Sequence, residues 1–220
     1  RNKSFRPTDL EFGLDGALYI SDFYYPIIGH AQHSIRDANR DYENGRVWRV
    51  TRKGAALAKA PAIEGASLAS LFGLLDHPQV AVRELVRNEL ERRPLAEVVA
   101  FAKGQVAAGK KNETFGLELL WLFERAKDYS QTDLLRDLLA SKDIRVQRAA
   151  ARSLRWWDAV LDGDAAAIAK RFLEGDDERL RIAVLSVASY LQADDIAWRN
   201  LIDNAEATAN SPLAKVVSLA

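Results

Sequence analysis

The chain of 220 residues contains no cysteine. Without a thiol it cannot form a disulfide, a thiolate metal site, an iron–sulfur cluster or a covalently attached haem. It also lacks an excess of either charge, because 31 basic side chains balance 31 acidic ones. The chain therefore has no net positive charge that would attract nucleic acid or an anionic membrane over a long range. No apolar run approaches the roughly 18–20 residues of a membrane span, and the 48% hydrophobic composition is that of a folded protein of one or two domains.

The first quarter of the chain, residues 1–54, has the pattern of β-strands. Residues 8–12 and 46–51 alternate between polar and apolar side chains, and residues 17–20 form a further short strand after a glycine turn. The segment 22–43 between the second and third strands is longer than an ordinary connection. Since three strands and one long loop cannot enclose a core, we expect one blade, or the remnant of one, from a larger β-structure.

The remainder of the chain is predicted to be mainly α-helical. Residues 55–66, rich in alanine and lysine, are predicted to form a linker. Helical periodicity and short polar turns then predict helices at 67–76, 79–92, 95–108, 113–127, 132–140, 144–160, 165–174, 178–191 and 196–208.

The predicted helices repeat in pairs. Val82, Val146 and Leu180 occupy equivalent positions in the second helix of three pairs, and are spaced by 64 and 34 residues, so that the first interval holds two units. Helix pairs at this spacing predict a HEAT-like α-solenoid over 67–220, although the usual period is about 40 residues. A helix start at Ser211-Pro212 is followed by only two turns, so we expect the solenoid to be truncated and the chain to be part of a longer polypeptide.

The long loop 22–43 carries the densest set of candidate site residues. One interpretation is a ligand site at the mouth of the β-structure, since long loops often carry function. The other is a loop held to its own domain by Arg–Asp pairs and histidine hydrogen bonds, which is favoured because buried polar groups need such partners. The candidates for either role are Asp22, His30, His33, Arg36 and Arg40.

The same loop contains a weak pattern for a cation. Asp37, Asn39 and Asp41 place oxygen ligands at alternate positions, which suits calcium. The match to an EF-hand fails, because Tyr42 stands where the turn glycine is needed and Trp48 where a bidentate glutamate is needed. Calcium is therefore the one cofactor that the residues of this chain suggest.

A row of arginines is predicted on one face of helix 144–160. Their spacing of three, four and three residues would let them bind an acidic partner or phosphates. The alternative, a solvated helix face, is favoured because the total charge is zero. The adjacent Trp156 and Trp157 cannot share a face, so one is predicted in the core and the other partly exposed. The candidate partner-binding residues are Arg145, Arg148, Arg152 and Arg155.

No motif identifies a catalytic residue. The sequence has no glycine-rich phosphate loop, no G-x-S-x-G motif and no H-E-x-x-H motif. The paired acids at 176–177 and 194–195 stand at predicted helix starts, where capping explains them.

Residues 5–24 look like a blade of the sugar-dehydrogenase-like β-propellers. The continuation over 26–41 and 45–50 resembles the large exported proteins of planctomycetes and relatives, called PVC-type haem-binding or membrane-bound dehydrogenase-domain proteins. Ala31 departs from the methionine expected there. In that family the propeller is followed by HEAT-like repeats and a c-type cytochrome domain with a C-x-x-C-H motif.

The resemblance implies that the chain is the propeller-to-solenoid junction of an oxidoreductase-like protein, exported and periplasmic or membrane-associated. The full protein would be a dehydrogenase of sugar or alcohol type, and haem c or quinone would lie outside this chain. The solenoid would act as a scaffold for other domains or subunits, including a cytochrome c. The alternative is a non-catalytic protein-interaction scaffold in a larger assembly. Nucleic-acid binding through the arginines is not expected.

Overall fold

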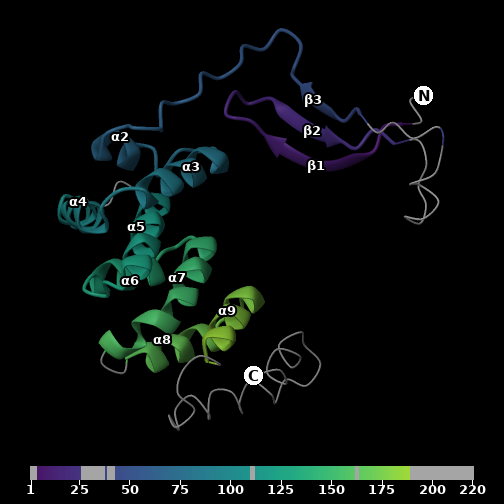
Figure 1. The fold of residues 1–220 in the computed structure, drawn as a ribbon. Helices are drawn as coiled ribbons and strands as arrows, with labels where there is room; N and C mark the ends of the chain where they lie inside the picture. Colours follow the sequence, from purple (N-terminus) through teal and green to yellow (C-terminus); the bar gives the residue numbers. More distant parts are fainter. Residues whose placement is uncertain (1–3, 26–37, 39–42, 110–111, 162–163, 189–220) are drawn as a thin grey trace. The chain divides into compact units, whose positions relative to one another are not determined.

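The computed structural model describes residues 4–25, 38, 43–109, 112–161 and 164–188 (Figure 1). Within these residues the chain is mainly helical, with one small antiparallel sheet, which confirms the predicted mainly α class. The chain forms two compact units, residues 1–89 and 90–220. The first two described helices thus belong to the unit that holds the sheet, and the sequence-based boundaries at 54 and 66 stay a prediction.

The sheet has three strands in the order β1-β2-β3, each antiparallel to its neighbour. They are β1 (Pro7–Phe12), β2 (Leu18–Asp22) and β3 (Arg46–Val50). The turn between β1 and β2 is held by Asp15, which accepts hydrogen bonds from the Ala17 amide at 3.0 Å and the Tyr19 hydroxyl at 3.1 Å. Arg49 of β3 forms an ion pair with the same carboxylate. One acidic side chain thereby joins the turn to the third strand.

One face of the sheet is apolar. The register pairs Leu10 with Ile20 and Phe12 with Leu18, and β3 continues these rows. Since directly paired residues point to the same side, all three strands contribute to what we call the apolar sheet face: Leu10, Phe12, Leu18, Ile20, Trp48 and Val50. Leu10 and Phe12 are each 62% exposed, so much of this face is in contact with solvent in the described structure.

The first unit also contains α2 (Leu68–Gly73) and all but the last two residues of α3 (Val80–Glu91). Ser67 caps α2 by accepting a hydrogen bond from the Ser70 amide at 3.2 Å. The buried Glu89 of α3 accepts a hydrogen bond from the Gly65 amide at 3.1 Å. The end of the predicted linker is therefore attached to the helix pair that follows it.

The second unit is built from helix pairs. Its described helices are α4 (Leu95–Ala107), α5 (Glu113–Ala126), α6 (Thr132–Leu139), α7 (Ile144–Trp157), α8 (Asp164–Leu173) and α9 (Glu178–Ala188). A short 3-10 helix (Asp158–Val160) follows α7. The members of each pair contact each other, and the second members contact in series, α5 with α7 and α7 with α9. Figure 1 shows this succession from teal to yellow-green.

Most predicted helix positions are confirmed within one to three residues at each end. The predicted ends of α2, at residue 76, and of α7, at residue 160, each lie three residues beyond the observed end, and the continuation after α7 is a 3-10 helix. The predicted helix 196–208 lies outside the described residues. Trp157 is 0% exposed and Trp156 is 49% exposed, as expected for neighbours on different helix faces.

Helix α5 ends in a conformation that favours glycine. Its C-cap, Lys127, has φ 54° and ψ 33°, and the following Asp128 amide donates a hydrogen bond to the Phe123 carbonyl at 2.9 Å. A side chain at a left-handed position costs about 1 kcal/mol relative to glycine.

We therefore expect Lys127→Gly to raise the free energy of unfolding of the helical unit by about 0.5–1 kcal/mol, measured by urea unfolding. Lys127→Ala retains the Cβ and is the control, for which no gain is expected. Equal stabilisation by both substitutions would show that the lysine charge, and not backbone strain, limits stability here.

Candidate functional site

Asp22 is the centre of a polar cluster where the long loop leaves β2. Its side chain is 3% exposed. Oδ1 accepts hydrogen bonds from the Arg6 amide at 2.7 Å and the Tyr24 amide at 2.9 Å, and Oδ2 accepts one from Trp48 Nε1 at 2.8 Å. One carboxylate thereby joins the segment before β1, the start of the loop and strand β3.

Arg46 holds the other end of the loop, where the chain enters β3. Its register partner across the sheet is Asp22. The Arg46 guanidinium carbon lies 3.4 Å from the centre of the Tyr24 ring and 5.6 Å from that of the Trp48 ring. Tyr24 has φ 50°, a left-handed conformation that is rare for an aromatic residue. We call these five residues, Arg6, Asp22, Tyr24, Arg46 and Trp48, the loop clamp.

The electrostatics of the loop clamp keep Asp22 ionised. Burial by itself would raise the pKa of the Asp22 carboxyl, but the hydrogen bonds from Arg6, Trp48 and Tyr24 and the positive charge of Arg46 outweigh it and lower the pKa below its usual range. A carboxylate fixed by three donors is suited to positioning the backbone and not to exchanging a proton with a substrate.

A cavity of about 540 Å³ opens beside the loop clamp. Thr8 and Ser21 form a hydroxyl pair with their oxygens 2.7 Å apart. Phe23 and Tyr25 contact edge to face at 6.0 Å between ring centres. The remaining lining includes Glu43, Asn44, Arg46 and Val47. Hydroxyl, amide and carboxylate groups beside aromatic rings can bind a small polar ligand.

Asp22 is the one loop candidate that falls within the described residues. His30, His33, Arg36 and Arg40 lie outside them, as do the proposed calcium ligands Asp37, Asn39 and Asp41, so those assignments stay predictions. Within the described part of the chain, no group of three or more His, Asp or Glu side chains could hold a metal ion. No helix in the described part is both long and apolar enough to cross a membrane. The lack of cysteine means that the chain does not fit covalent haem c.

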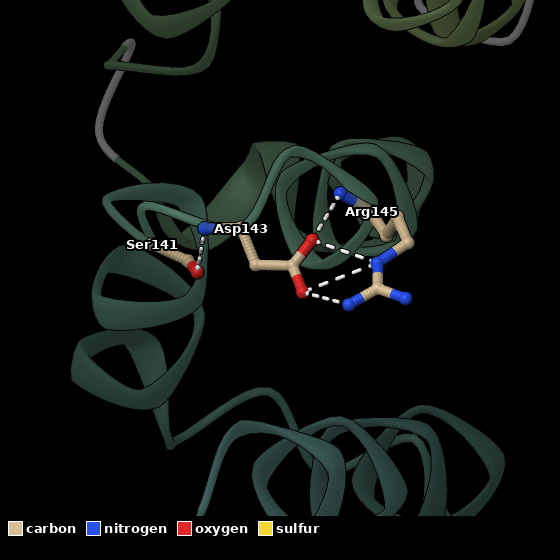
Figure 2. Close-up of polar contacts among 3 residues, drawn as sticks. All are labelled: Ser141, Asp143 and Arg145. Carbon is tan, nitrogen blue, oxygen red and sulfur yellow. Dashed lines mark hydrogen bonds and ion pairs between the residues drawn. The ribbon is translucent and has the colours of Figure 1, made fainter.

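The first of the four predicted partner-binding arginines, Arg145, is bonded to a carboxylate of its own helical unit (Figure 2). Arg145 Nε and Nη2 donate to the Asp143 carboxylate at 3.0 and 2.6 Å. Asp143 also caps α7 by accepting a hydrogen bond from the Arg145 amide at 2.9 Å, and its own amide donates to Ser141 Oγ at 3.0 Å. The Arg145 side chain, followed by the hydrogen bond from the Arg145 amide, lowers the pKa of Asp143 to about 2.

The second arginine connects two helices. Arg148 Nε and Nη2 donate to the Asp177 carboxylate at 3.0 and 2.6 Å. Asp177 also accepts a hydrogen bond from the Leu180 amide at 2.6 Å and so caps α9, which confirms the capping expected for this acid. The Arg148 bond lowers the pKa of Asp177. Arg148 therefore joins α7 to the start of α9.

The other two arginines are placed differently. Arg155 is exposed, and its guanidinium carbon lies 4.8 Å from the centre of the Trp156 ring. Arg152 is exposed and has no hydrogen bond or ion pair within the described part of the chain. Of the four predicted arginines, Arg145 and Arg148 are thus bonded to helix-capping carboxylates, and Arg152 and Arg155 are exposed on the C-terminal half of α7.

Sequence reasoning did not single out Glu124 of α5. Trp157 Nε1 donates to its Oε1 at 3.2 Å, and Ser153 also forms a hydrogen bond with it. Burial raises the pKa of Glu124, against the opposing effect of these bonds and of Arg155. One feature of the sequence could have indicated Glu124. It directly follows the apolar run 115–123, so its carboxylate lies next to the buried face of the helix.

The raised pKa makes a prediction about stability and pH. A raised carboxyl pKa favours folding below the unfolded value of 4.5, and this contribution is lost as pH rises through the folded value. Glu124→Gln should therefore raise the melting temperature at neutral pH, and the difference from the parent chain should disappear near pH 4. Glu97→Gln, at an exposed position of α4 with no ion pair among the described residues, is the control, and its melting temperature should stay close to that of the parent chain. A lower melting temperature for Glu124→Gln at both pH values would contradict the assigned role of burial.

Comparison with known proteins adds one match. A family model described as a domain of unknown function (DUF7133) matches residues 1–54. This range contains the three strands, the long loop and the loop clamp. No curated protein and no solved structure gives a significant match to the chain.

Proposed function

We propose that this chain is the junction between a β-propeller blade and a HEAT-like α-solenoid in an exported oxidoreductase-like protein, periplasmic or membrane-associated. The full protein is a dehydrogenase of sugar or alcohol type that passes electrons to a c-type cytochrome. In this proposal the solenoid is the scaffold that holds the electron-transfer partners together. The residues of this chain position segments and do not carry the redox chemistry.

The observation that carries the proposal is the apolar sheet face. Its two β1 side chains are largely exposed, whereas the opposite side of the same strands presents Asp9, Glu11 and Arg49. A three-stranded sheet with one apolar face needs a second layer for stability. A neighbouring propeller blade would supply that layer, in agreement with the family resemblance of residues 5–50.

The helix contacts support the scaffold part of the proposal. The second helices contact one another in series while each also contacts its own first helix. This is the arrangement by which repeated helix pairs extend into a solenoid. The Arg148–Asp177 bonds fasten one pair to the next at a helix cap.

The loop clamp supports a defined role for the loop it holds. Asp22 and Arg46 lie at the two ends of the loop and are paired across the sheet. In this proposal the clamp fixes the two ends of the segment that holds the predicted ligand-site residues.

The coding sequence on either side of the chain tests the proposal. Intact propeller blades before residue 1 and a C-x-x-C-H motif after residue 220 are expected. The absence of both features would favour the second candidate function, a non-catalytic interaction scaffold. That alternative is favoured here by the exposed arginines and tryptophan of α7, which resemble the side chains used at protein interfaces.

A further inference from the structure

The C-terminal half of α7 presents an aromatic and cationic surface. Trp156 is 49% exposed, and the guanidinium of Arg155 lies over its ring. Arg152 is one turn earlier on the same side of the helix and is also exposed. Val160, one turn later, is 40% exposed. We call Arg152, Arg155 and Trp156 the α7 patch.

The charge of the α7 patch differs from that of the rest of the helix. Arg145 and Arg148, in the N-terminal half, each face a carboxylate that neutralises them. In the C-terminal half, the charge of Arg155 acts on the partly buried Glu124 and lowers its pKa against the effect of burial. The positive charge of Arg152 therefore remains without a carboxylate partner among the described residues, one turn from the exposed indole.

A purely structural role does not account for all three side chains. Arginine in the last turns of a helix interacts favourably with the helix dipole, which explains the charge at Arg152 and Arg155. It does not explain a half-exposed tryptophan, since the core position at this turn is already filled by Trp157. Tryptophan and arginine are the residues most enriched at the energetic centres of protein interfaces.

We propose that the α7 patch is a docking site for an acidic segment of a partner protein. Carboxylates of the segment pair with Arg152 and Arg155, and an apolar side chain between them covers the Trp156 ring. The stacking of Arg155 on Trp156 orients its guanidinium before binding, which lowers the entropy lost on association. Helix α7 contacts both α5 and α9, the second helices of the neighbouring pairs. The docked segment therefore lies on the central one of these three helices.

A peptide titration tests the proposal on the complete chain. The probe is a fluorescein-labelled peptide with glutamate and leucine at helical spacing, and its counterpart carries glutamine in place of glutamate. We expect saturable binding of the glutamate peptide, which weakens as salt is raised, and a loss of at least ~10-fold in affinity for the Arg152→Glu/Arg155→Glu variant. Binding of the peptide should quench the fluorescence of Trp156 in the parent chain. Trp156→Ala should weaken binding and remove this quenching.

Arg171→Glu provides the matched control. Arg171 is exposed on α8 and lies 5.0 Å over the Phe172 ring, so it reproduces an arginine–aromatic pair outside the α7 patch. Its affinity for the glutamate peptide should be unchanged, and circular dichroism should show that all variants are folded. Equal binding by the Arg152→Glu/Arg155→Glu variant, equal binding of the glutamine peptide, or an equal loss in Arg171→Glu would overturn the proposal. Preferential binding of a short DNA duplex would overturn it as well, in favour of a phosphate site.

Discussion

Replacement of Trp157 by alanine is expected to lower the free energy of unfolding of the helical unit by about 3–5 kcal/mol. The side chain is completely buried, its Nε1 donates to Glu124, and its ring contacts that of Tyr129 edge to face at 5.4 Å between centres. Alanine would leave a large cavity between α5 and α7 and would remove a donor from a half-buried carboxylate. Urea unfolding monitored by far-UV circular dichroism measures the loss.

The neighbouring tryptophan is a control of the same residue type. Trp156→Ala removes a side chain of equal volume from the exposed side of α7 and should change the free energy of unfolding by no more than about 0.5 kcal/mol. A similar loss for both variants would contradict the assignment of Trp157 to the core and Trp156 to the surface.

Replacement of Asp22 by alanine is expected to remove the folded sheet while the helical unit remains. The substitution leaves the amides of Arg6 and Tyr24 and the indole N–H of Trp48 without their common acceptor. Three strands are close to the lower limit of independent stability, so a loss of this kind is not tolerated. Two-dimensional NMR would show the Trp48 indole signal moving to an unfolded position while helical amide signals are retained.

Two further measurements make this prediction specific. Asp9→Ala removes an exposed carboxylate from β1 whose one recorded bond, from the Leu10 amide, is local, and it should leave the sheet folded. The lowered pKa of Asp22 means that its contribution is present above the unfolded value of 3.8 and is lost as pH falls below it. Acid should therefore release the Trp48 signal in the parent chain. A sheet that survives Asp22→Ala would show that the loop clamp is dispensable.

The helical part could be predicted because its signals are local. Asn112 precedes α5 and accepts a hydrogen bond from the Phe115 amide at 2.9 Å, and Asp143 caps α7 in the same way. Capping residues and apolar periodicity are both visible within a few residues of sequence. The end of α7 was one exception, because a change from α to 3-10 geometry at Asp158 depends on how the last turn packs and not on local composition.

The site was only partly predictable because its contacts are long-range. The density of charge in the loop indicated Asp22 as a site residue. Its partner Trp48 is 26 residues away, and the sequence analysis considered Trp48 only as the residue that replaces glutamate in the calcium-binding pattern. Arg148 and Asp177, 29 residues apart, were each noted separately, and nothing in the sequence joined them. Pairs that form across a sheet or between helices require the register, which composition and periodicity do not supply.

The most direct test of the proposed function is the visible absorption spectrum of the natural polypeptide that contains this chain, recorded before and after reduction. The proposal predicts the sharp bands of a reduced c-type haem, carried covalently by the polypeptide outside residues 1–220 or by a cytochrome bound to it. Covalent haem should remain with its polypeptide after denaturing extraction, because thioether bonds hold it. A polypeptide that contains no covalent haem and binds no haem-bearing partner would contradict the proposal and leave the non-catalytic scaffold in its place.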